Sequence, residues 1–123
     1  MVKSCSQSRN DASPAPAQPA VFDADRLSQS TMGDTALGAE IMNLFLVQLG
    51  QAEDQVLTAA TAQDWKFLTH TLKGSAATVG AMELAALARL LEEGGLPASL
   101  EERQAARQAL TDAATAFRGQ TGM

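Results

Sequence analysis

From Val21 onward, apolar side chains recur at the three- and four-residue spacing of amphipathic helices. The pattern predicts a short helix over residues 23–29 and a long one over residues 34–60, with Asp34 or Thr35 at the N-cap of the long one. We expect the long helix to be buried over much of its circumference and to form the spine of a bundle. Its large apolar residues are Ile41, Leu44, Phe45, Val47 and Leu49.

Three further helices are predicted after this one, separated by short connections. The first begins at Asp64 as N-cap and ends at Gly80, which suits the left-handed position after a helix end. The second stops at Gly94 and Gly95, and its apolar positions are Leu84, Leu87, Ala88 and Leu91. The third starts with a capping-box pattern, Ser99 followed by Glu102, and its apolar face comprises Ala106, Leu110, Ala113 and Phe117.

Short connections make consecutive helices antiparallel neighbours. We therefore predict an all-α fold, an antiparallel up-and-down four-helix bundle with a short additional N-terminal helix, over residues 21–118, and a C-terminal tail over residues 119–123. Residues 1–20 hold all but one of the four prolines and almost no large apolar side chain. Such a segment buries too little surface to offset its ordering entropy, so we predict a disordered leader, with a stretch left by cloning as the alternative for its extreme end.

Composition narrows the class of protein. A chain of 123 residues amounts to one domain, and an aromatic content of only 4 % favours helix over sheet. The net charge of −5 argues against a nucleic-acid or anionic-membrane binder, since both partners require a basic face. The single Cys5 cannot form an internal disulfide, and no stretch resembles a signal peptide or a membrane span. We expect a cytoplasmic monomer.

The one histidine of the chain, His70, lies on the helix predicted to end at Gly80. At 100° per residue, the core face of that helix comprises Trp65, Leu68, Leu72, Ala76 and Val79. His70 lies two residues from both Leu68 and Leu72, near the opposite pole. We therefore expect its imidazole to face solvent rather than to pack in the core, which is the more common role of a lone histidine.

The neighbours of His70 on the same face are Lys66, Lys73, Gly74 and Ala77, at helical spacings of three, four and seven residues. A glycine inside a helix costs about 1 kcal/mol relative to alanine, and the close approach of another molecule over His70 would explain Gly74. Residues 65–80 hold two lysines and no carboxylate. Lys73 is therefore placed to pair with a phosphorylated His70, although a solvated helix face is an alternative reading of the lysines.

The segment from His70 to Gly80, HTLKGSAATVG, resembles the signature of the histidine phosphotransfer (HPt) family, H-x-L-K-G-S-(A/S)-x-x-x-G. The resemblance extends weakly over residues 21–118. It implies that His70 accepts a phosphoryl group, most plausibly at Nε2, and that Lys73 stabilises the phosphoryl oxygens. Gly74 would leave room for the partner, and Ser75 and Gly80 would have structural roles in the helix and the following turn. From the helical wheel, we expect Lys66, Phe67 and Ala77 to border the docking surface.

The resemblance implies a carrier in a two-component phosphorelay rather than an autonomous enzyme. The chain has neither a glycine-rich phosphate loop nor a kinase-like Lys and Asp set, and no acidic cluster suited to Mg²⁺ near His70. We expect no cofactor on this chain, and Mg²⁺ on the partner instead. The expected partners are receiver domains of hybrid sensor kinases and response regulators, which carry aspartyl phosphate.

Three alternatives remain. A catalytic enzyme would need more groups than one histidine and one cysteine supply. A sensor-kinase dimerisation domain normally has an acidic residue directly after the histidine, whereas this chain has Thr71. A pure interaction module, a bundle that binds receivers without transferring phosphate, is disfavoured by the presence of His70, Lys73 and Gly74 but remains open.

Overall fold

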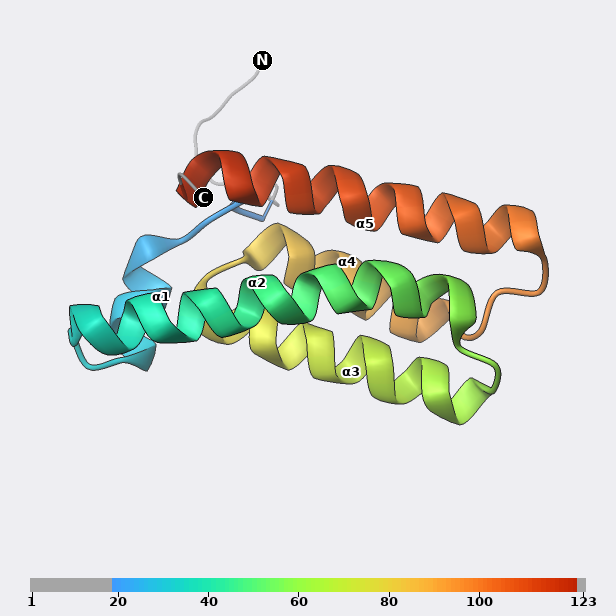
Figure 1. The fold of residues 1–123 in the computed structure, drawn as a ribbon, viewed down its shortest axis with the longest axis horizontal. Coiled ribbons are helices and arrows are strands. Elements are labelled where there is room, and N and C mark those ends of the chain that lie inside the picture. Colours follow the sequence, from blue (N-terminus) through green and yellow to red (C-terminus); the bar gives the residue numbers. More distant parts are fainter. Residues whose placement is uncertain (1–18, 122–123) are drawn as a thin grey trace, which may run out of the picture.

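The computed structural model describes residues 19–121. In the described part of the chain there are five α-helices and no strand (Figure 1). They are α1 (Ala24–Ser30), α2 (Thr35–Thr58), α3 (Ala62–Val79), α4 (Met82–Gly94) and α5 (Leu100–Thr121). The predicted all-α class is confirmed.

The four longer helices form the predicted bundle. Helix α2 packs against α3 and α5, and α4 packs against the same two helices, so each of the four has two neighbours (Figure 1). The short α1 lies against α2 and α3 at one end of the bundle. Helices α3 and α4 form a tight antiparallel pair, because only Gly80 and Ala81 separate them.

Side-chain caps define the start of α1, α2, α3 and α5. Asp34 caps α2, as predicted, by accepting from the backbone N–H of Leu37 at 3.0 Å. The prediction of Asp64 as N-cap of α3 is wrong: Thr61 Oγ1 accepts from the Asp64 backbone N–H at 3.0 Å, and the helix starts at Ala62. Asp64 instead adds negative charge to the first turn, where the helix dipole favours it.

The apolar core runs along the axis of the bundle and is formed by all four long helices. Its largest fully buried side chains are those of Trp65, Phe117, Leu49, Leu72, Leu84 and Leu110. The expectation that α2 is buried over much of its circumference is wrong, since Leu44 is 66 % exposed and Val47 is 61 % exposed. Only one face of α2 is in the core. On the exposed side of the helix, Leu44 and Val47 form an apolar strip.

The turn between α3 and α4 joins the N-terminal segment to the bundle. The Asp23 backbone N–H donates to the Gly80 carbonyl at 2.7 Å, and the Glu83 N–H donates to the Ala20 carbonyl at 2.8 Å. Gly80 has a φ of 87°, the left-handed conformation predicted for a helix end. A Cβ at this position would also collide with the Asp23 carbonyl oxygen. Glycine is therefore required here for two reasons.

The expectations for the two ends of the chain have different outcomes. Helix α5 continues to Thr121, so most of the tail expected over residues 119–123 is helical. The predicted leader lies mostly outside the described residues, which begin at position 19. No helix in the described part of the chain is both long and apolar enough to cross a bilayer.

Candidate functional site

His70 projects from the middle of α3 into solvent, as the helical wheel predicts. Its side chain is 67 % exposed, whereas the adjacent Thr69 is buried and donates its hydroxyl to the Trp65 carbonyl at 2.9 Å. One face of α3 is thus anchored in the core while His70 stands on the other. A partner can reach the imidazole without any rearrangement of the helix.

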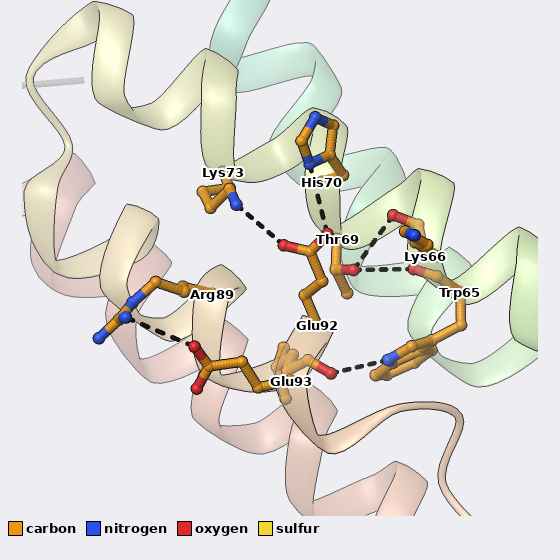
Figure 2. Close-up of polar contacts among 9 residues, drawn as sticks. Trp65, Lys66, Thr69, His70, Lys73, Arg89, Glu92 and Glu93 are labelled. Carbon is orange, nitrogen blue, oxygen red and sulfur yellow. Dashed lines mark hydrogen bonds and ion pairs between the residues drawn. The ribbon is translucent and has the colours of Figure 1, made fainter.

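Glu92, from the last turn of α4, lies between His70 and Lys73 (Figure 2). Its Oε2 is 3.3 Å from Nδ1 of His70, and its Oε1 accepts from Nζ of Lys73 at 2.9 Å. The Glu92 side chain is 19 % exposed and the Lys73 side chain 33 % exposed. In Figure 2 the second ring nitrogen of His70, Nε2, points away from Glu92.

The charges around this carboxylate lower the pKa of Glu92. The hydrogen bond from Lys73 is the largest cause, and the charges of Lys73 and His70 act in the same direction, while partial desolvation opposes them. Glu92 is therefore ionised at neutral pH. The negative charge of Glu92 thus partly offsets the positive charge of the two lysines on α3. Lys73 forms an ion pair with Glu92 in this structure.

The backbone next to Glu92 is tied directly to α3. The indole Nε1 of Trp65 donates to the carbonyl oxygen of Leu91 at 2.9 Å, between the first turn of α3 and the end of α4 (Figure 2). Neighbouring Glu93 points elsewhere and pairs with Arg89 at 3.4 Å. Of these two consecutive acidic residues, only Glu92 contacts His70.

The other residues of the motif have different surroundings. Gly74 is exposed, one helical turn after His70, and a Cβ there would meet nothing within 4 Å. Ser75 is half-buried, and Ala77 is half-buried against the core. The open space over Gly74 fits the expectation that it leaves room for a partner, and Ala77 is less exposed than Gly74.

An open groove between α2 and α3 adjoins the histidine. His70, Gly74 and Thr78 line it from α3, and Ile41 and Leu44 line it from α2. A second groove continues toward the start of α3 and includes Phe67, which is 73 % exposed. The predicted surface residues Lys66 and Phe67 are thus both exposed on α3, one turn before His70.

Reasoning along the sequence noted Glu92 only in the acidic end of its helix and gave it no role at the site. A helical wheel for α3 shows no carboxylate near His70, because the carboxylate comes from another helix. A usable signal was present: with a turn at Gly80 and Ala81, His70 lies ten residues before the turn and Glu92 eleven after it. In an antiparallel pair, positions at similar distances from the turn lie side by side.

The arrangement suits a surface nucleophile that works with a partner. It combines an exposed imidazole, a cation and a carboxylate, and within residues 19–121 no group of three or more His, Cys, Asp or Glu side chains is placed to hold a metal ion. An imidazole that carries its proton on Nδ1 has a free electron pair on Nε2. In this geometry, Nε2 is the ring nitrogen directed away from Glu92, on a side chain that is 67 % exposed.

Comparison with known proteins identifies the family of the chain. The family model described as Hpt domain matches residues 40–118, a range that includes His70, Lys73 and Glu92. Neither the curated proteins nor the solved structures gave a significant match. The matched range covers more than half of the chain and most of α2 to α5. The chain therefore belongs to the Hpt domain family.

Proposed function

We propose that this chain performs on His70 the histidine phosphotransfer that its family serves in phosphorelays. The observation that carries the proposal is the exposed imidazole of His70, whose Nδ1 lies 3.3 Å from Glu92 and whose Nε2 is left uncovered by that contact. The Nε2 electron pair attacks the phosphorus of an aspartyl phosphate on a receiver domain. The aspartate carboxylate leaves with the electrons of the broken P–O bond. Attack by the aspartate of a second receiver then returns the imidazole to its neutral form.

Lys73 is the residue of this chain that stabilises the transferred group. Phosphoryl transfer spreads negative charge over the equatorial oxygens, and catalysis depends on positioning and on neutralising that charge. Lys73 supplies one cation on the same face as His70. We infer that the receiver contributes Mg²⁺ and most of the remaining catalytic groups, so the chain acts as a phosphocarrier and not as an enzyme with its own turnover.

The groove between α2 and α3 is the proposed docking surface for the receiver. Leu44 and Phe67 are exposed apolar side chains on either side of the His70 region, and Lys66 adds a positive charge at its edge. A receiver that binds an aspartyl phosphate close to its surface needs to approach the imidazole over a flat, uncrowded face. Gly74 itself lines the groove on α3, and a Cβ there would meet nothing within 4 Å, so the surface beside the imidazole is open.

The proposal is tested by reconstituting the relay with purified receiver domains encoded near this chain. Wild-type protein is expected to take phosphate from a phosphorylated receiver and to deliver it to a second one, and His70→Gln to do neither. ATP without a kinase is expected to leave the chain unlabelled, whereas labelling by ATP alone would indicate a sensor-kinase domain. Binding of receivers without transfer would indicate an interaction module and would overturn the proposal.

A further inference from the structure

A groove rich in glutamine continues from the His70 region toward the start of α3. Three of its glutamines come from α2, at helical spacings of three and four residues, and one comes from α3. They are Gln48, Gln51, Gln55 and Gln63. Because Gln48 also lines the groove next to His70, the two grooves form one continuous surface. We call the part with the four glutamines the glutamine groove.

The amides of this groove are available to a partner. Gln51, Gln55 and Gln63 are exposed, and within residues 19–121 none of their side chains forms a hydrogen bond. By contrast, the side-chain amide of Gln108 on α5 donates to Asp112 at 2.9 Å. A glutamine amide carries two N–H donors and an acceptor oxygen. The groove thus presents several hydrogen-bonding groups that the described part of the chain leaves unpaired.

The glutamine groove carries almost no charge. Among the described residues, Asp64 is its one ionisable lining residue, and His70 is the one in the adjoining groove. The whole chain, in contrast, has a net charge of −5. A receiver that holds Mg²⁺ and a phosphorylated aspartate also has acidic groups near its contact face. A neutral groove allows two such proteins to meet without placing like charges opposite each other.

The glutamine groove lies within reach of a receiver docked on His70. Gln63 lies seven positions before His70 on α3, which is about 10 Å at the rise of an α-helix. A standard interface buries about 800 Å² on each partner, a patch roughly 30 Å across. A receiver centred on the imidazole therefore extends over the glutamine groove, and the amides lose water when it binds.

The two parts of this surface discriminate between receivers to different degrees. Apolar contacts with Leu44 beside His70 are non-directional and suit any receiver with an apolar face. Hydrogen bonds are directional, and an amide that is buried without a partner loses its bonds to water. A receiver without matching groups over the glutamine groove is therefore penalised. Every receiver carries the phosphorylated aspartate, so the histidine itself does not distinguish one receiver from another.

We propose that the glutamine groove selects the receiver, by hydrogen bonding to a polar but uncharged face beside the receiver's phosphorylation site. This inference rests on the proposed function of His70. The groove acts on binding and not on the transfer step, because the imidazole contacts Glu92 and, within the described residues, none of the glutamines hydrogen-bonds to it.

The test uses Gln51→Ala and Gln55→Ala, singly and together, with Gln104→Ala as the matched control. Gln104 is exposed on α5 and lies outside both grooves. A second pair, Gln51→Glu and Gln104→Glu, adds the same charge at the two places. Each protein is titrated calorimetrically with two unphosphorylated receivers, one encoded near this chain and one from an unrelated relay. Folding of each variant is checked by circular dichroism and thermal unfolding.

The double variant is expected to bind the receiver encoded near this chain about tenfold more weakly, the combined loss of two ordinary hydrogen bonds. Its affinity for the unrelated receiver is expected to stay near the wild-type value. Gln51→Glu is expected to weaken binding at least as much as Gln51→Ala, because the added charge is desolvated against an uncharged face. In transfer assays the half-saturating receiver concentration rises, rather than the rate at saturation falling. The Gln104 variants are expected to match wild type.

Wild-type affinity of the folded double variant for the receiver encoded near this chain, or equal losses for both receivers, would overturn the inference. Tighter binding by Gln51→Glu would reveal a cation opposite the groove and would contradict it as well. Failure of the proposed function looks different: wild-type protein would bind the receiver but transfer no phosphate. The titrations would then still decide whether the glutamine groove selects the receiver.

Discussion

Trp65 donates its indole N–H to the carbonyl oxygen of Leu91 at 2.9 Å and thereby joins the first turn of α3 to the last turn of α4. Trp65 is 1 % exposed, and the bond that its indole makes is partly buried, at the edge of the core. Because Glu92 follows Leu91 directly, the bond also ties the backbone that carries the Glu92 carboxylate to α3. A core residue thus sets the geometry of a surface site.

Trp65→Phe should lower the stability of the protein and weaken the connection between α3 and the end of α4. The substitution keeps an aromatic ring but removes the donor, which leaves the Leu91 carbonyl without this partner. We expect a loss of about 1 kcal/mol in the free energy of unfolding, the usual net value of such a bond, with a further cost for the smaller ring. Urea unfolding measures it. An unchanged midpoint would show that the bond contributes nothing.

Two glycines of the motif should respond to alanine in opposite ways. Gly80→Ala places a Cβ at a φ of 87° and against the Asp23 carbonyl, so we expect a loss of at least about 1–2 kcal/mol. Gly74→Ala meets open space inside a helix and should raise stability by roughly 0.5–1 kcal/mol. Thermal unfolding of both variants gives the signs, and equal effects would contradict the different environments described for them.

Stability should depend on Glu92 in a specific pH range. Its pKa is lowered in the folded protein, chiefly by Lys73, relative to its ordinary value of 4.5. The unfolded state therefore binds the proton more readily. The stabilisation is present in full above 4.5 and is lost as the pH falls through the lower, folded pKa.

Urea unfolding at about pH 7 and about pH 3 checks this dependence. Wild type should exceed Glu92→Gln in stability at neutral pH, and the difference should shrink at acidic pH. Glu93→Gln, in which the lost pair is well exposed, should show a smaller dependence. A difference between wild type and Glu92→Gln that is equal at both values would rule out the ion pair as its source.

The exposed apolar strip on α2 should matter for partner binding and not for folding. Leu44 is 66 % exposed and lines the groove next to His70, so Leu44→Ser should weaken receiver binding by about tenfold, as for an interface residue of moderate weight. Leu100, which is 65 % exposed at the start of α5, is the control because it lies outside the groove. Calorimetric titration with a receiver distinguishes the two, and equal losses would place the docking surface elsewhere.

The sequence predicts those features that depend on one helix at a time. The exposure of His70, the left-handed Gly80 and the cap at Asp34 follow from periodicity and local hydrogen bonding, and all three are found. Thr61 was missed because threonine and aspartate are both good caps, and the true helix start is set by local backbone geometry. The exposure of Leu44 and Val47 depends on where α3 and α5 pack on α2, which apolar content alone does not specify.

The position of Glu92 is another feature that the pattern of a single helix does not predict. Its contact with His70 joins two helices across a turn and depends on their exact register, which the Trp65–Leu91 bond helps to set. Motif reasoning singled out the candidate nucleophile His70 and the candidate cation Lys73, which both lie on α3. It expected Lys73 to stabilise the phosphoryl oxygens and did not foresee the ion pair that Lys73 forms with a residue of the neighbouring helix.

The most direct measurement of the central claim is the site of phosphorylation after incubation with a phosphorylated receiver, mapped by mass spectrometry under neutral or basic conditions. The account predicts one acid-labile, base-stable phosphoryl group on His70, and none in His70→Gln. A phosphoryl group on any other residue, or equal labelling of His70→Gln, would contradict it.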